Sequence, residues 1–203
     1  MIDKEQLKKI QDFAIDLDWN RAFGGKSHGN KHLCRAVSIA REIVLEELST
    51  NIDLKKSIDE TIVEAGTWLH DSGLAKNLYG DALCNKDEIV NFLKSIGIFS
   101  EDIERIISCI NSHDGKHLAL SLEAQIVNDA DTLEKLGPLG IIRETWKRSQ
   151  MGWNTEKIAT HLKTHLERRK NDLHTQKAKE IASKIWKPLP GFFTELETQL
   201  LRT

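Results

Sequence analysis

The sequence predicts an all-α fold, and three observations support this prediction. Apolar residues recur at intervals of three and four over most of the chain, which is the spacing of amphipathic helices. The 203 residues include only three prolines, and two of these, Pro188 and Pro190, stand close to the C-terminal end. No run alternates between apolar and polar residues in the way that a half-buried strand requires. We therefore expect a bundle of helices.

The helices are expected in the following order. The first begins after Asp3, which is a capping residue, and the second begins near Ser27, beyond a loop with two glycines. The third is expected from about Asp53 and ends in a histidine and an aspartate. Ser100 and Ser121 are expected to cap two of the later helices. These later helices are expected over residues 86–96, from Ser100 to the segment 111–115, from Ser121 to near Gly137, and over residues 141–150, 155–173, 175–186 and 192–201.

Composition limits the classes of partner and compartment. The 29 basic and 31 acidic residues give a formal net charge of -2, so there is no overall attraction to a nucleic acid polymer or a membrane surface. The three cysteines are widely spaced and form no Cys-x-x-Cys pair, which favours free thiols in a reducing compartment. The first residues lack the apolar core of a signal peptide. We expect a cytoplasmic protein.

Histidines and aspartates recur close to the expected helix ends. The apolar run that ends at Leu69 is followed directly by His70 and Asp71, and burying such a pair is costly unless a cation compensates it. A divalent metal ion can do so, because imidazole and carboxylate are both natural ligands. His28 and His32 lie four residues apart at the start of another helix, and therefore on one face.

Asp129 and Asp131 lie on one expected helix, about 200° apart around its axis. They should not share one ion, so one of them is expected to be a ligand. The other is expected to orient a ligating histidine or to cap a neighbouring element.

The ordered set His32-x-x-Arg35, His70-Asp71 and Ala130-Asp131 resembles the HD superfamily of metal-dependent phosphohydrolases. Further segments resemble a bacterial branch of uncharacterised HD hydrolases, and the resemblance extends over about residues 27–186. These segments are Ser27-His28-Gly29, Ser112-His113, Asp129 to Leu133, Gly137, Gly140 to Arg143, and Leu173 to Lys179.

The resemblance implies one HD-type domain over residues 1–203, with a core over about 27–140 and a C-terminal helical extension over about 141–203. It also implies that His32, His70, Asp71 and Asp131 are metal ligands, with Asp129 behind them. Two nitrogens and two carboxylates leave positions open for water and substrate. The ion is one of Mn, Mg, Co, Ni, Fe or Zn, and one ion per chain is expected.

The resemblance further implies hydrolysis of a phosphate ester or anhydride, in a nucleotide or a small phosphorylated metabolite. Arg35, Lys76 and Arg143 are candidates to bind the phosphate charge, and as an alternative they form surface salt bridges. His28 and His113 are candidates to move a proton to the leaving group, and as an alternative they are helix caps.

Two departures from the family pattern narrow the mechanism. Leu74 stands where some HD nucleotidases have a glutamate, and residues 82–86 contain no histidine of the kind that binuclear members supply.

Two rival functions stay open. One is a di-iron HD-fold oxygenase, which needs a second metal ion. The other is a module that binds a metal ion or a nucleotide without catalysis.

Overall fold

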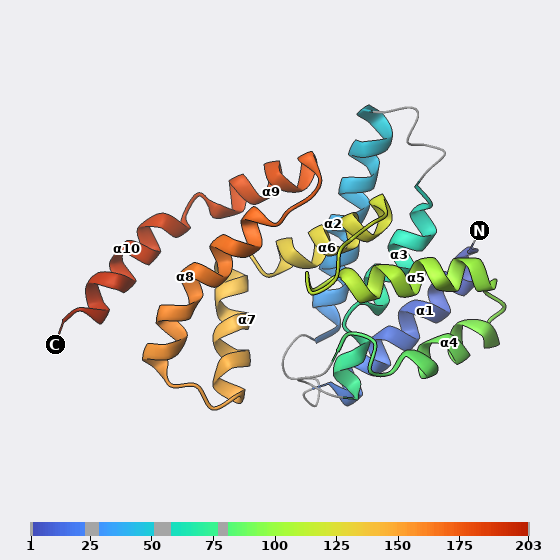
Figure 1. Cartoon of the computed structure of the whole chain (residues 1–203), viewed down its shortest axis with the longest axis horizontal. Coiled ribbons are helices and arrows are strands. Elements are labelled where there is room, and N and C mark those ends of the chain that lie inside the picture. The colour runs from blue at the N-terminus through green and yellow to red at the C-terminus, as the bar shows by residue number, and fades with distance from the viewer. Residues whose placement is uncertain (1, 23–28, 51–57, 77–80, 203) are drawn as a thin grey trace. The chain divides into compact units, whose positions relative to one another are not determined.

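The computed structural model of the chain describes residues 2–22, 29–50, 58–76 and 81–202 (Figure 1). Helices make up most of these residues and no strand occurs among them, so the predicted all-α class is confirmed. In this described part, no helix has the length and apolar character needed to span a membrane. The helices are α1 (Lys4–Asp16), the π-helical turn η1 (Leu17–Arg21), α2 (Gly29–Thr50), α3 (Glu60–Leu69), the 3-10 turn η4 (Ser72–Ala75), α4 (Lys86–Ser95), α5 (Ser100–Ser112), α6 (Leu122–Glu134), α7 (Gly137–Gln150), α8 (Thr155–Asn171), α9 (Gln176–Trp186) and α10 (Leu189–Leu200).

The helices form two compact units, residues 1–131 and residues 132–203. The boundary falls inside α6, directly after Asp131. The expected division of a single HD-type domain into a core that ends near residue 140 and an extension from 141 stays a prediction. We describe each unit by itself.

In the first unit, α3 is the central helix. It contacts α1, α2 and α5, and most of its residues are buried, from Ile62 to Leu69 with the exception of Glu64. A helix that is apolar on nearly every side must lie inside a protein rather than on its surface. Burial on all sides holds the end of α3 rigidly, and that end carries His70 and Asp71.

Two of the predicted helix caps are confirmed. The Asp3 carboxylate accepts a hydrogen bond from the backbone N–H of Gln6, and the Gln6 side chain accepts one from the Asp3 N–H, which completes a capping box. The Ser121 hydroxyl accepts a hydrogen bond from the N–H of Ala124, at the start of α6. Both caps satisfy backbone donors that have no partner within the helix.

Four predicted helix starts are wrong. Two helices begin earlier than expected: α7 at Gly137 instead of Ile141, and α10 at Leu189 instead of Phe192. Phe99, not Ser100, is the N-cap of α5, and it makes no side-chain capping bond. Asp53 lies outside the described residues, but α3 begins at Glu60, after an Asp59 whose side chain accepts from the N–H of Thr61. The start of α3 was predicted too early, because the apolar periodicity in the sequence continues on the N-terminal side of the capping residue Asp59.

Asp59 also belongs to an ion-pair cluster that joins α3, α5 and α6. Arg105 on α5 pairs with Glu123 on α6, and its guanidinium lies 3.5 Å from Asp102 and 3.9 Å from Asp59. Burial raises the pKa of the Asp59 carboxyl, but hydrogen bonds from Thr61 and the backbone of Ile62, with the charge of Arg105, outweigh burial and lower that pKa below its usual range.

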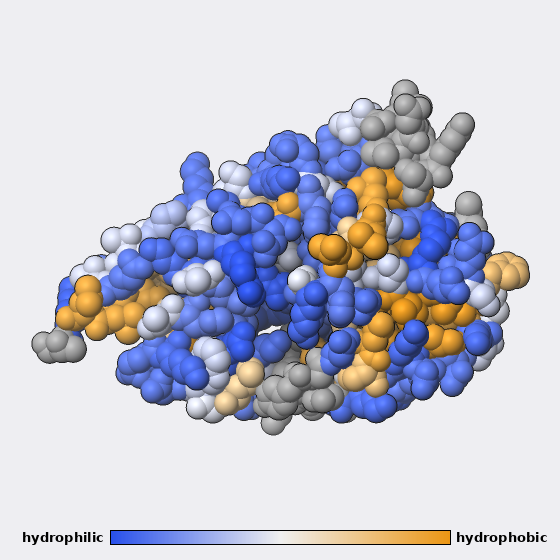
Figure 2. Space-filling model, in the orientation of Figure 1, coloured by the Kyte–Doolittle hydropathy of each residue, from blue (hydrophilic) through white to orange (hydrophobic). Residues whose placement is uncertain are grey.

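In the second unit, α7 and α8 form a helical hairpin, and α10 packs against α8 (Figure 1). Their buried residues include Leu162 and Leu166 on α8 and Phe193 on α10. Across the chain, hydrophilic side chains cover most of the face seen in Figure 2, with apolar patches between them. This distribution agrees with cores that bury the apolar stripes read from the sequence.

Candidate metal centre

The structure brings His32, His70, Asp71 and Asp131 together inside the first unit. His32 comes from α2, His70 and Asp71 follow the last residue of α3, and Asp131 comes from α6. One potential ligand atom from each residue lies within 4.8 Å of the others, and all four side chains are buried. Three helices that are distant in sequence thus place two imidazoles and two carboxylates around one point.

The spacing of the ligand atoms fits a single metal ion. His32 Nε2 lies 3.1 Å from His70 Nε2 and 3.2 Å from Asp71 Oδ2, and His70 Nε2 lies 3.4 Å from Asp131 Oδ1. Ligands about 2.1 Å from one ion are about 3.0 Å apart in octahedral geometry and about 3.4 Å apart in tetrahedral geometry. These four residues could hold a divalent ion, and their mixed nitrogen and oxygen donors do not select its identity.

Helix-end hydrogen bonds set the direction of the imidazoles. His70 Nδ1 donates to the backbone carbonyl of Thr67 at 2.6 Å, and His113 Nδ1 donates to that of Ile110 at 2.7 Å. Each histidine is the C-cap of its helix, α3 or α5. With Nδ1 used in this way, the Nε2 lone pair of His70 faces the other ligands, which is the arrangement that supports metal-ligating histidines.

The cluster carries excess negative charge. Burial lowers the pKa of the His70 imidazole, but the carboxylates of Asp71 and Asp131 outweigh burial and raise that pKa to about 10. Two carboxylates in a buried site therefore require a positive charge between them, either a proton on His70 or a metal ion.

His113 is also brought to this site. Its Nε2 lies 3.6 Å from Asp71 Oδ1, and its ring stands edge-on to that of His70 with the centroids 5.2 Å apart. His113 is nearly buried and lies outside the four-residue ligand group. The structure therefore places it beside the predicted ligands, where a proton-carrying residue is expected.

The turn after Asp71 packs against the segment that precedes α4. A Cβ on Gly73 would lie 2.5 Å from the carbonyl oxygen of Ala82, so only glycine lets the two segments pack so closely. Asn85 donates to the Ser72 carbonyl at 2.9 Å, and the Cys84 thiol donates to the Gly73 carbonyl. These contacts hold the η4 turn, and with it the position of Asp71.

Asn128 supports the site from α6. Its side-chain amide donates to the carbonyls of Ser112 and His113, both at 2.9 Å, and so closes the end of α5. Asn128 stands three residues before Asp131, on the same side of the helix. Sequence reasoning missed Asn128 and Asn85, although a polar amide within an apolar helical stripe was a usable signal for Asn128.

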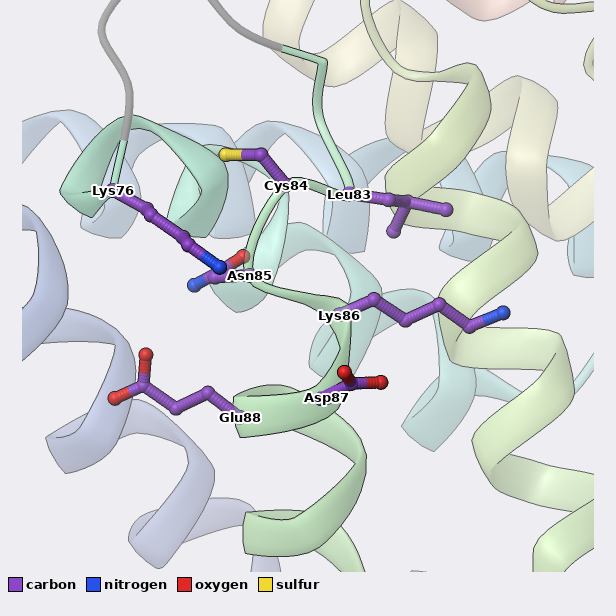
Figure 3. Close-up of a pocket in the computed structure, with 7 residues that line it drawn as sticks. All are labelled: Lys76, Leu83, Cys84, Asn85, Lys86, Asp87 and Glu88. Atoms are coloured by element: carbon purple, nitrogen blue, oxygen red, sulfur yellow. The ribbon is translucent and has the colours of Figure 1, made fainter.

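The two candidate phosphate-binding residues of the first unit lie near ligands in the sequence: Arg35 on the helix that carries His32, and Lys76 after the turn that follows Asp71. Arg35 is half-buried on α2, one turn beyond His32. Lys76 follows η4 and lines a cavity of about 200 Å³ together with Cys84, Asn85 and Glu88. In Figure 3 the Lys76 side chain extends toward Asn85. Their role in binding substrate stays a prediction.

Three predicted site residues are left to place: Arg143, Asp129 and His28. Arg143, in the second unit, donates from Nη1 to the backbone carbonyl and a carboxylate oxygen of Glu134, both at 3.2 Å. This contact agrees with the salt-bridge alternative, and a role in substrate binding stays a prediction. Asp129 is fully buried on α6, but Asp131 supplies the carboxylate of the ligand group. His28 lies outside the described residues.

The fold matches that of a solved HD-superfamily hydrolase. No family model matches the sequence. The structure superposes on an HD-superfamily hydrolase from Bacillus thuringiensis with a TM-score of 0.71 and 18% identity, covering 98% of this chain and 99% of that one. The chain therefore shares the fold of this hydrolase, which agrees with the resemblance of its motifs to the HD superfamily.

Two further proteins are similar over most of the chain. A structure from Lactobacillus plantarum superposes with a TM-score of 0.77 and 24% identity, covering 98% of both chains. The chain is 28% identical to YpgQ of Bacillus subtilis over 164 residues, which cover 76% of this chain and 80% of YpgQ. A crystal structure of YpgQ in complex with ADP gives a TM-score of 0.72 and 23% identity, covering 100% of this chain and 98% of YpgQ.

Proposed function

We propose that this protein is a metal-dependent phosphohydrolase that cleaves a phosphate ester or anhydride in a nucleotide or a small phosphorylated metabolite. One observation carries the proposal: His32, His70, Asp71 and Asp131 are buried with their ligand atoms within 4.8 Å of one another. The HD-superfamily fold supports it, because a hydrolase with this fold superposes on nearly the whole chain.

A divalent ion bound by these residues would lower the pKa of a bound water and polarise a phosphoryl oxygen. The chain itself would supply proton transfer and orientation. His113 Nδ1 donates to the carbonyl of Ile110, which leaves Nε2 as the atom that exchanges a proton. That atom lies 3.6 Å from Asp71 Oδ1, so His113 stands directly beside the ligand group, where it could pass a proton to a leaving group.

The class of substrate rests on charge and on the relatives. The nearly balanced net charge of -2 does not favour a nucleic acid polymer. YpgQ has been crystallised with ADP, which supports a nucleotide as the substrate of this chain. Arg35 and Lys76 are the residues that we assign to the phosphate groups, since guanidinium and ammonium groups neutralise phosphate charge.

The proposal is tested by metal analysis and a hydrolysis screen. The purified protein is stripped with a chelator, reloaded with Mn, Mg, Co, Ni, Fe or Zn, and assayed for phosphate release from nucleoside mono-, di- and triphosphates and from small phosphate esters. We expect activity that depends on the added ion. His70→Ala and Asp131→Asn should abolish this activity, because each removes a ligand. His117→Ala, which changes an exposed histidine of the same unit, is the matched control and should keep it.

Absence of hydrolysis with every metal and every phosphate compound would contradict the proposal and favour a binding module. Oxygen consumption with iron, without release of phosphate, would favour a di-iron oxygenase instead. Circular dichroism of each variant shows whether a loss of activity comes from the site or from unfolding.

A further inference from the structure

A second group of potential ligands lies in the second unit, formed by Glu144, His161 and His165. His161 and His165 stand four residues apart on α8 and so project from one face of that helix. Glu144 comes from α7, the other arm of the hairpin seen in Figure 1. One ligand atom from each of the three residues lies within 4.8 Å of the others.

Both imidazoles direct the same ring nitrogen at the carboxylate. His161 Nε2 lies 3.0 Å and His165 Nε2 lies 3.7 Å from Glu144 Oε1. The two rings are stacked, with centroids 4.7 Å apart and planes inclined by 30°. Two stacked imidazoles would repel each other if both were protonated, whereas a shared ion uses their lone pairs without adding a proton to either ring.

The spacing and the donor set are those of helical zinc sites. Two histidines at i and i+4 on one helix face hold Zn²⁺ in many proteins, and a glutamate commonly supplies the third ligand. Such a set leaves a fourth position open. Imidazole-rich sites favour Zn²⁺, Co²⁺, Ni²⁺ and Cu²⁺ over Mg²⁺ or Ca²⁺, which prefer oxygen ligands.

Neighbouring side chains hold the three residues in place. Arg148 Nε donates to Glu144 Oε1 at 2.6 Å and fixes the carboxylate one turn along α7. The Trp153 ring stands edge-on to His161, with the centroids 5.2 Å apart, and Lys157 Nζ lies 4.1 Å from the centre of the same indole. The positive charge of Arg148 beside Glu144 disfavours a second cation there. The two imidazole nitrogens must therefore supply most of the binding, which suits an ion with strong affinity for nitrogen.

We propose that Glu144, His161 and His165 bind a divalent transition-metal ion of the zinc class, separate from the ion of the first unit, and that this ion joins α7 to α8. All three residues belong to residues 132–203, whereas the four ligands of the first site belong to residues 1–131.

Zinc stoichiometry tests this proposal directly. Chelator-stripped wild-type protein is titrated with Zn²⁺ by calorimetry, and we expect two ions per chain. The double variant His161→Ala/His165→Ala should bind one ion, as should His70→Ala, because each retains one of the two sites. His117→Ala/His174→Ala, which removes two exposed histidines, is the matched control and should still bind two ions.

Cobalt spectroscopy gives a second measurement that does not depend on altering the second unit. Co²⁺ added to folded His70→Ala protein should produce the visible absorption of a nitrogen- and oxygen-ligated ion, and Zn²⁺ should displace it. The proposal is overturned if the double histidine variant binds as many zinc ions as the wild type, or if His70→Ala binds none. Hydrolytic activity enters neither readout, so failure here is distinct from failure of the proposed function.

Discussion

Replacement of Gly66 by alanine tests the close packing that positions the metal centre. Gly66 lies on α3 one turn before His70, and a Cβ at this position would stand 2.7 Å from the Cβ of Cys109 on α5. Ordinary contact between carbon atoms is about 3.5–4.0 Å, so α3 and α5 would have to separate by about 1 Å. Overpacking of this kind costs about 1–3 kcal/mol, while alanine regains about 1 kcal/mol of helix propensity.

We therefore expect Gly66→Ala to lower the free energy of unfolding by up to about 2 kcal/mol. Urea denaturation in the presence of a chelator, followed by circular dichroism, measures this loss without a contribution from bound metal. Gly191→Ala on α10 is the control, because a Cβ there meets nothing within 4 Å. That variant should be neutral or slightly stabilised.

A compensating change sharpens the test. Cys109→Gly removes the Cβ that Gly66→Ala would meet, so the double variant should lose less stability than the sum of the two single changes. Burial raises the pKa of the Cys109 thiol, so its removal takes away packing and not a thiolate. If Gly66→Ala is more stable than the wild type by about 1 kcal/mol, the full gain that helix propensity alone predicts, the close approach of α3 to α5 is refuted.

Three more outcomes follow from the contacts. Arg143→Met should lower the free energy of unfolding in urea by about 3 kcal/mol, because it leaves the buried Glu134 carboxylate without the guanidinium. An unchanged free energy of unfolding, together with a raised KM, would instead assign Arg143 to substrate binding. Asn128→Ala should cost about 1–3 kcal/mol in the same assay, since the carbonyls at the end of α5 lose two hydrogen bonds. The pKa of the Asp59 carboxyl lies below its ordinary value of 3.8, so this group stabilises the fold above pH 3.8 and loses the effect as the pH falls below that value. The free energy of unfolding of Asp59→Asn should therefore fall less steeply between pH 5 and pH 3 than that of the wild type. An equally steep fall would contradict the lowered pKa of Asp59.

The sequence predicted the helices well because their apolar stripes are long and regular. It also predicted which residues meet at the metal centre, since His32, His70, Asp71 and Asp131 follow an order that resembles a known family. That these residues bind metal stays a prediction until the ion is measured. The start of α3 was misplaced, because helix ends depend on single capping side chains that periodicity does not detect.

Other features depend on contacts between distant segments and leave no local pattern. Gly66 is an ordinary glycine in the sequence, and only the structure shows that Cys109 lies against it. Gly73 faces Ala82 across a turn in the same way. The group of Glu144, His161 and His165 requires α7 to fold back on α8, although the spacing of its histidines was visible in the sequence. Contacts of this kind need the tertiary fold.

Two helices end at the candidate metal centre, and their ends bear on the order in which a cation and a phosphate would bind under the proposed function. His70 and His113 cap the C-terminal ends of α3 and α5, where aligned peptide dipoles place about half a negative charge each. Added to the carboxylates of Asp71 and Asp131, these ends repel any phosphate that approaches an ion-free centre. If the proposed function is correct, we expect the cation to bind first and the phosphate second, so that removal of the ion weakens the affinity for substrate and product alike.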